Sequence, residues 1–237
     1  MYPFFYAVLF LKKPNKNMKI QVPTDLNDIT VGQYQRFMAA NTEGAEEDFL
    51  LFKTIEIFCD VDIKIVSQFP LATAQELMEE ITAVLNQEKG FQESFQFEGQ
   101  EYAFLPDLEA MSIGEYIDLE SGLADVKDLH KAAAVMYRPV KDRRGELYSV
   151  QPYEGTNAEV HRAKDFPIGA VSAGVVFFYN IANELLRAFR LSSLKEKRQK
   201  ESQTIAENLN SVRNGAGTTA FMHSLEEMLQ GYSKQQN

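Results

Sequence analysis

Residues 108–139 read LEAMSIGEYIDLESGLADVKDLHKAAAVMYRP, and this stretch predicts how the chain is built. Ser112 can accept a hydrogen bond from the backbone N–H of Glu115, and the Glu115 carboxylate can accept one from the N–H of Ser112, which together make a helix-capping box. Two short amphipathic helical runs are predicted behind it. We expect a break near Ser121-Gly122 and an end before Pro139, because proline disfavours helical backbone in the preceding residue.

The same pattern occurs once before. Residues 26–37, LNDITVGQYQRF, match residues 108–119, and Thr30 and Gln33 form the equivalent capping box. A short strand and a proline precede each copy. The repeat therefore predicts a mainly α fold of the α+β class, with two related helical halves, short β-hairpins and a C-terminal helical extension.

Composition shifts divide the chain into four parts. Residues 1–17 are an apolar extension, interpreted as a segment upstream of the domain with a translation start at Met18; a β-strand or docking segment is the alternative. Residues 18–90 form the first helical half. Residues 91–191 contain a hairpin and the second half with an inserted hairpin, and residues 192–237 contain a polar helix, a Gly linker and a terminal amphipathic helix.

Local signals place the individual elements. Helices are expected over about residues 31–40 and 49–58, and a third begins at Thr73 with Glu76 as its capping partner. Alternating residues around Glu98-Gly99 indicate one hairpin, and residues 141–156 contain the inserted one. The capped motifs are 82 residues apart, whereas the pairs Phe69-Pro70 and Phe166-Pro167 are 97 apart. The second half is thus longer by about the size of the inserted hairpin.

Two further capping and packing signals come after the inserted hairpin. Thr156 and Glu159 match a capping box for a short helix. Residues 170–190 are the most apolar helical run, but polar and charged residues interrupt it, so we interpret it as a core helix and not a membrane span. Ala170 and Gly174 are small and one turn apart, and they predict the close approach of a neighbouring helix.

The totals restrict the classes of function. A formal net charge of -10 argues against nucleic-acid binding, which requires clustered excess Lys and Arg. The single cysteine, Cys59, is interpreted as a buried residue of an apolar helix. Three dispersed histidines lack metal-ligand spacing, and no carboxylate pair or phosphate loop is recognisable. We therefore predict no catalysis, no metal and no cofactor.

Two features are candidates for partner binding. A basic group lies on or beside the inserted hairpin, and local ion pairs with Asp142 and Glu146 are the alternative interpretation; the group is Arg138, Lys141, Arg143 and Arg144. The other candidate is the terminal helix, about residues 219–230, which can lay its apolar face into a groove of a partner or pack back on its own domain. That face contains Phe221, Leu225, Met228 and Leu229.

The run DLHKAAAVM before Tyr137-Arg138-Pro139, the inserted hairpin, and Tyr153-Glu154-Gly155-Thr156 after it resemble proteins of tailed-phage structural gene clusters. Residues 60–80, with a short turn, Phe-Pro and a helix, have a similar pattern. The resemblance is to tail- or baseplate-assembly chaperones, which are mostly helical cytoplasmic proteins that hold a tail component before assembly. It covers residues 26–189, and no functional residues transfer with it.

This resemblance implies a non-enzymatic, chaperone-like adaptor in the host cytoplasm whose partner is a phage tail or baseplate protein. The net charge and the interrupted apolar helix predict that neither nucleic acid nor a membrane is a partner. A permanent virion connector or baseplate protein that docks through its C-terminal helix is the alternative. An enzyme remains a third class, which a metal or nucleotide bound to the purified protein would indicate.

Overall fold

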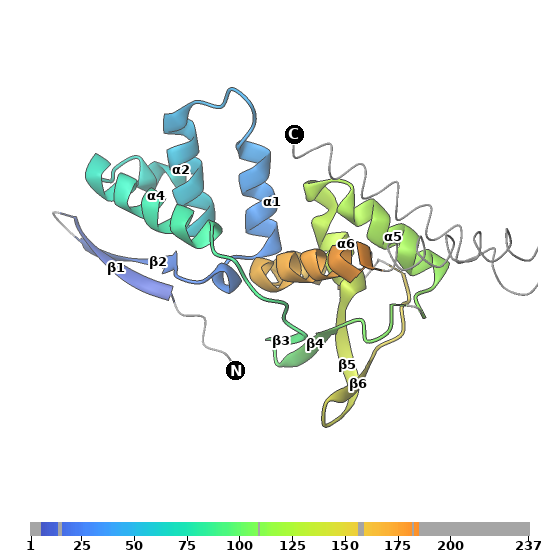
Figure 1. Ribbon diagram of the computed structural model, residues 1–237. Helices are drawn as coiled ribbons and strands as arrows, with labels where there is room; N and C mark the ends of the chain where they lie inside the picture. Colours follow the sequence, from blue (N-terminus) through green and yellow to red (C-terminus); the bar gives the residue numbers. More distant parts are fainter. Residues whose placement is uncertain (1–5, 14–15, 109, 156–158, 182, 185–237) are drawn as a thin grey trace, which may run out of the picture. The chain divides into compact units, whose positions relative to one another are not determined.

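The computed structural model describes residues 6–13, 16–108, 110–155, 159–181, 183 and 184 of the chain. Residues 1–174 and 175–237 are two compact units, and each is considered by itself. The first unit is a mainly helical α+β structure with a small four-stranded antiparallel sheet (Figure 1). No helix among the described residues is long and apolar enough to cross a membrane.

The first half starts with two paired strands, β1 (Tyr6–Lys13) and β2 (Lys16–Pro23). A 3-10 turn, η1 (Leu26–Asp28), leads into helix α1 (Val31–Ala40). The predicted capping box of α1 is confirmed: the Thr30 hydroxyl accepts from the Gln33 N–H at 3.1 Å, and the Gln33 amide oxygen accepts from the Thr30 N–H at 2.9 Å. The start of this helix is therefore fixed by local bonds, as the sequence pattern requires.

Three helices complete the first half: α2 (Glu47–Phe58), α3 (Ile63–Val66) and α4 (Leu71–Leu85). The expected start of α4 at Thr73, with Glu76 as capping partner, is wrong. Pro70 precedes the first helical residue, and no side chain caps this end. Proline has no N–H to satisfy and a fixed φ, so Phe69-Pro70 begins the helix without a capping box.

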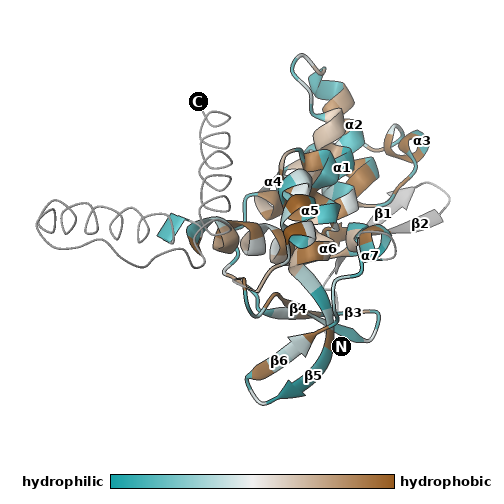
Figure 2. Ribbon diagram, turned by 90° about the vertical axis from the view of Figure 1, so that its right-hand side faces the viewer, coloured by the Kyte–Doolittle hydropathy of each residue, from teal (hydrophilic) through white to brown (hydrophobic). Residues whose placement is uncertain are grey.

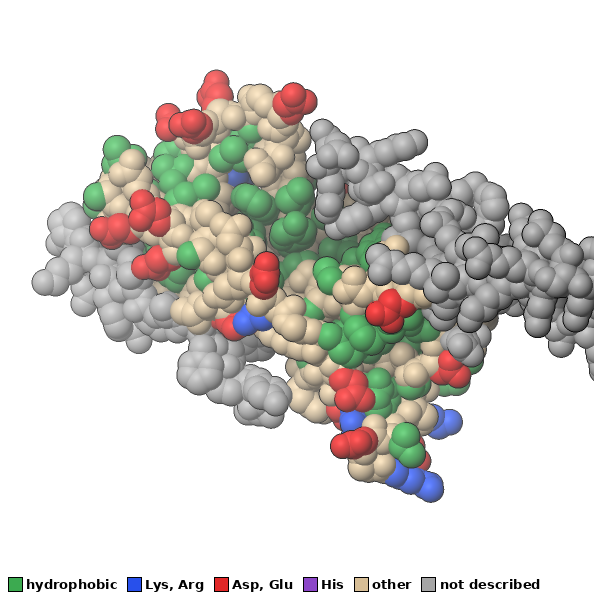
Figure 3. All heavy atoms as spheres, viewed as in Figure 1, with side chains coloured by type: hydrophobic (Ala, Val, Ile, Leu, Met, Phe, Trp, Pro, Cys, Tyr) green, Lys and Arg blue, Asp and Glu red, His purple; other side chains and the backbone are tan. Residues whose placement is uncertain are grey.

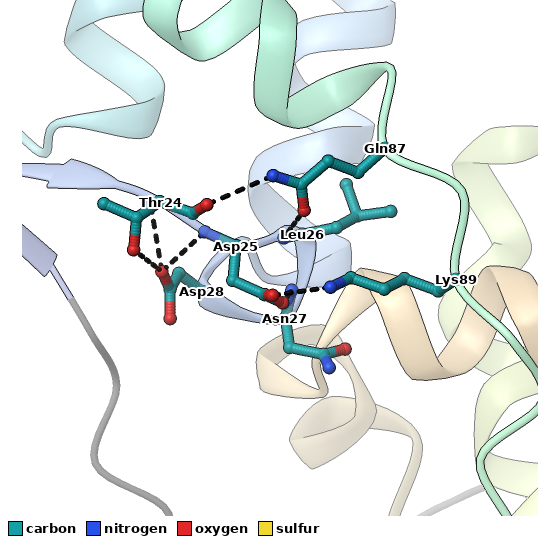
Figure 4. Close-up of polar contacts among 7 residues, drawn as sticks. All are labelled: Thr24, Asp25, Leu26, Asn27, Asp28, Gln87 and Lys89. Carbon is teal, nitrogen blue, oxygen red and sulfur yellow. Dashed lines mark hydrogen bonds and ion pairs between the residues drawn. The ribbon is translucent and has the colours of Figure 1, made fainter.

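The end of α4 holds the η1 turn in place (Figure 4). The Gln87 amide oxygen accepts from the Leu26 N–H, and its amide nitrogen donates to the Thr24 carbonyl, both at 3.1 Å. Lys89 forms an ion pair with Asp25. The Gln87 side chain thus satisfies one backbone N–H and one carbonyl of this turn, and it holds the start of the first capped motif next to the end of α4.

The second half repeats this order. The hairpin β3 (Ser94–Phe97) and β4 (Gln100–Phe104) turns at Glu98-Gly99, where both residues have positive φ as a type I′ turn demands. Helix α5 (Ile113–Leu123), the 3-10 turn η2 (Val126–Asp128) and helix α6 (Leu129–Met136) come next. The Ser112–Glu115 capping box is confirmed at 2.6 and 3.2 Å.

The break between these two helices and the end of the second one lie close to where the sequence predicts them. Helix α5 ends at Leu123, directly after the predicted break at Ser121-Gly122, and Gly122 lies against α6. A Cβ at Gly122 would lie 2.4 Å from the Ala132 backbone nitrogen. The run ends at Met136, and Pro139 lies inside a strand opposite Tyr102.

That strand, β5 (Tyr137–Arg144), forms the inserted hairpin with β6 (Leu147–Val150), which confirms the predicted second hairpin. The strand order is β3-β4-β5-β6, so β4 and β5 join the two hairpins into one sheet. The β5–β6 hairpin extends away from the helices in both ribbon views (Figures 1 and 2).

The short segments α7 (Glu159–Arg162) and η3 (Ala163–Asp165) bring the chain back to the first half. Phe166 is fully buried against aromatic rings of the β3–β4 hairpin, with ring centroids 4.8 Å from Tyr102 and 5.1 Å from Phe95. A helix begins at residue 168, directly after Pro167, and is described through residue 184 apart from residue 182. Thr156 and its neighbours lie outside the described residues, as do residues 185–237.

At Gly174 the close approach is made by a strand residue, Tyr137. A Cβ at Gly174 would lie 2.8 Å from the Tyr137 hydroxyl oxygen. That hydroxyl is within 3.1 Å of the Ala170 carbonyl and 2.8 Å of the Gln92 carbonyl. The small residues therefore admit a buried tyrosine that needs a hydrogen-bond acceptor.

Candidate functional site

The tip of the β5–β6 hairpin combines apolar and basic exposure. Gly145 has φ of 65°, which suits the first central position of a two-residue type II′ turn between Arg144 and Leu147. The Leu147 side chain is 79% exposed. The Arg144 side chain is 86% exposed and lies 3.4 Å from Asp142. Figure 3 shows the Lys and Arg side chains gathered at this end of the hairpin.

Arg143 is fixed on the same hairpin and supports its shape. Its guanidinium binds both carboxylate oxygens of Glu101 on β4, at 2.8 and 3.2 Å. It also lies 4.8 Å from the centre of the Tyr148 ring on β6. The Tyr148 hydroxyl in turn donates to the Phe104 carbonyl at 2.8 Å. These cross-strand contacts hold the projecting hairpin against the rest of the sheet.

Arg138 lies apart from this exposed group, in the interior. Its guanidinium is 2.8 Å from the Glu115 carboxylate, and both side chains are almost completely buried. Burial raises the pKa of Glu115, but the bonds from Ser112 and Arg138 outweigh it and leave this pKa below its ordinary value. Burial lowers the pKa of Arg138, and Glu115 offsets part of that shift. Arg138 therefore links β5 to the N-terminus of α5 and is not available to a partner.

Helix α5 has a second exposed apolar surface. Ile113 is 81% exposed and Ile117, one turn on, is 55% exposed. Gly114 lies between them, and a Cβ there would meet nothing within 4 Å. The opposite side of the helix is buried through Glu115 and Leu119. Helix α5 thus has apolar residues on both its buried and its exposed side.

A polar hollow lies beside the corresponding helix of the first half. It has a volume of about 490 Å³ between α1, η2 and η3. Three cations, Arg36, Lys127 and Lys164, line it together with Asp165. None of the three cations forms an ion pair with another described residue. Gln35, which also lines the hollow, donates to the Val126 carbonyl at 2.7 Å and lies close to the buried His130 ring.

Cys59 and the possible metal ligands are the other residues that the sequence raises for chemistry. Cys59 is buried, as predicted, and this burial together with Glu80 raises the pKa of its thiol to about 12. Among the described residues no group of three or more His, Cys, Asp or Glu side chains could hold a metal ion. The predicted apolar stripe of the terminal helix, Phe221, Leu225, Met228 and Leu229, lies outside the described residues.

In comparisons with protein-family models, curated proteins and solved structures, the chain matches none of them. The residues themselves therefore carry the functional argument. The sequence predicted the basic group on the hairpin, of which Arg138 is buried, and its role in partner binding stays a prediction; it did not indicate the exposure of Leu147 or of one side of α5. A signal was present for the latter, since Ile117 stands where the first copy of the motif has Gln35.

Proposed function

We propose that this protein is a non-enzymatic phage morphogenesis protein, a chaperone-like adaptor that holds a tail or baseplate component through the tip of the β5–β6 hairpin. The observation that carries this proposal is the exposure of Leu147 beside Arg144 on a projecting hairpin whose base is fixed by Arg143 and Glu101. A partner that covers this exposed leucine removes apolar surface from water, which favours binding.

The hairpin also offers a backbone surface. Strand β6 is the last strand in the sheet order, so one side of its backbone pairs with no described strand. An extended segment of a client can add to such an edge by main-chain hydrogen bonds, while pockets for its side chains supply specificity. Arg144 and Lys141 on the neighbouring strand β5 favour a client segment with acidic residues.

The acidic character of the rest of the chain fits the same role. A formal net charge of -10 keeps a protein soluble while it carries an apolar client segment. The terminal helix predicted over residues 219–230 supplies a second apolar surface for the client. The chaperone class itself comes from the resemblance of residues 26–189 to tail- and baseplate-assembly chaperones.

The test is recovery of partners from producing cells with tagged full-length protein, followed by mass spectrometry beside purified particles. We expect recovery of a tail or baseplate protein and no copy of the adaptor in the particle. Leu147→Asp with Arg144→Glu should abolish recovery, whereas Ile113→Asp, which also adds a charge at an exposed apolar site, should leave it intact. Stoichiometric presence in particles would instead support a permanent connector or baseplate component.

A further inference from the structure

One side of helix α1 is covered by the end of the second half. The Val31 N–H donates to the Phe166 carbonyl at 2.9 Å, and the Ile168 N–H donates to the Ile29 carbonyl at 2.8 Å. Thr30 and Pro167 are the residues opposite each other in this antiparallel bridge. Val31 is 0% exposed and Ile168 is 3% exposed as a result. The segment 166–168 therefore closes the first capped motif.

The matching side of the second capped motif is open. By the alignment of the two copies, Ile113 corresponds to Val31, and its exposure is 81% instead of 0%. Gly114 corresponds to Gly32. A Cβ at Gly32 would lie 3.1 Å from the Lys164 carbonyl oxygen, whereas one at Gly114 meets nothing within 4 Å. Among the described residues, no segment covers this side of the second motif as residues 166–168 cover the first.

The chain contains a second copy of that cover. Phe69-Pro70-Leu71 ends the first half as Phe166-Pro167-Ile168 ends the second, and in each case the proline directly precedes a helix. Leu71 occupies the position of Ile168, yet it is 66% exposed. Within the part of the chain that the structure describes, an exposed apolar surface on α5 and a second, exposed Phe-Pro segment thus occur together.

Within one chain the two cannot meet. Helix α4, which begins at Leu71, and helix α5, which begins at Ile113, lie on opposite sides of the first unit (Figure 1). A second molecule removes this restriction, because its Leu71 segment can approach the α5 surface of the first molecule while its own α5 surface remains open.

We infer that the segment Phe69-Pro70-Leu71 of one molecule covers the exposed side of α5 of a second molecule, as Phe166-Pro167-Ile168 covers α1 within each chain. The expected bridge joins the Ile113 N–H to the Phe69 carbonyl and the Leu71 N–H to the Met111 carbonyl. Both N–H groups belong to first helical residues, which have no acceptor within their own helices. Leu71, Ile113 and Ile117 lose exposed apolar surface in the contact, which drives it.

Such a contact joins two different surfaces and is therefore heterologous. When two molecules form one such contact, one α5 surface and one Leu71 segment stay free and the contact continues into a ring or an open filament, whereas two molecules that exchange the contact reciprocally close as a two-fold dimer. This inference does not depend on the proposed client site, because the β5–β6 hairpin takes no part in the contact.

The test measures the mass of the full chain by sedimentation velocity and light scattering over a range of concentrations. We expect the mass of the unmodified protein to rise above that of a single chain. Ile113→Asp and Leu71→Asp should each remain monomeric, with association weakened at least about tenfold by a charge in an apolar contact. Both changes place an acid at the first residue of a helix, where it is tolerated, so each variant should keep its helical circular dichroism.

A mixture of Ile113→Asp and Leu71→Asp tests whether the two surfaces bind each other. Each variant retains one intact surface, so an equimolar mixture should form dimers and stop there. Leu147→Asp is the matched control and should associate like the unmodified protein. A monomeric unmodified protein, association that persists in either single variant, or a mixture that stays monomeric would overturn the inference. If Ile113→Asp loses its structure, Ile117→Asp tests the same surface in the same mixture.

Discussion

Helices α1 and α5 begin with the same capping box, but the third helical residue, Gln33 in α1 and Glu115 in α5, makes different contacts. In the first half the Gln33 amide accepts from Thr30 and donates to the Ile57 carbonyl at 3.0 Å, which ties α1 to the end of α2. In the second half the Glu115 carboxylate accepts from Ser112 and from Arg138. One neutral and one charged side chain thus perform the same local task, and they recruit different long-range partners.

The difference shows how a repeated motif can acquire two tertiary roles. An amide offers both a donor and an acceptor, so Gln33 can bridge two backbones without any charge. A carboxylate only accepts, and when buried it requires a cation. Glu115 therefore makes the fold of the second half depend on Arg138 of β5, on the strand that carries the inserted hairpin.

Removal of the Glu115 or Gln33 side chain should have the largest effect on the free energy of unfolding. Glu115→Ala eliminates one capping bond and leaves Arg138 buried without its carboxylate, which should cost about 3–5 kcal/mol of unfolding free energy. Gln33→Ala removes neutral bonds at a half-buried site and should cost about 1–2 kcal/mol. Urea unfolding followed by circular dichroism measures both. Equal losses would mean that the ion pair contributes nothing beyond the cap.

Acidification protonates Glu115 but not Gln33, and it should have the next largest effect on stability. The pKa of Glu115 is lower in the folded protein than its ordinary value, so its contribution to stability is present above the ordinary pKa and is lost as the pH falls through the folded value. The decrease in urea midpoint between about pH 7 and pH 3 should be smaller in Glu115→Gln than in the unmodified protein. Gln33→Glu is the reciprocal variant and introduces a carboxylate into the first capping box. An identical decrease in Glu115→Gln would exclude this carboxylate as a source of the acid sensitivity.

The capping boxes show what sequence can predict, and Arg138 shows what it cannot. Ser112 and Glu115 are three residues apart, so their bond is a consequence of helix geometry alone. Arg138 and Glu115 come together only because β5 pairs with β4, and nothing local specifies that register. The same reason hid the contact of Tyr137 with Gly174, where the sequence indicated a helix. The start of α4 was missed for a local reason, since Pro70 begins a helix without any cap.

The aligned copies show an extra apolar residue on α5, Ile117, but only the structure shows that this side of the helix is exposed. Val31 and Ile113 are both β-branched apolar residues at equivalent positions, and their sequence patterns do not distinguish them. Residues 163–168 return to α1 and bury Val31, whereas no described segment does the same for Ile113. Burial of an equivalent position thus depends on a segment that lies far from the capped motif in the sequence.

Substitution of the equivalent glycines Gly32 and Gly114 by alanine should have the smallest effect, and it tests stability and association separately. Gly114→Ala should stabilise the isolated chain by roughly 0.5–1 kcal/mol, because alanine costs less conformational entropy in a helix and nothing lies within 4 Å of the new Cβ. Gly32→Ala should show no such gain, because its Cβ would lie 3.1 Å from the Lys164 carbonyl oxygen. If a second molecule covers α5 as residues 166–168 cover α1, the Gly114→Ala chain should melt at a higher temperature when dilute and yet associate more weakly when concentrated. A methyl group that stabilises the free chain and also leaves association unchanged would show that no cover approaches Gly114 as closely as Lys164 approaches Gly32.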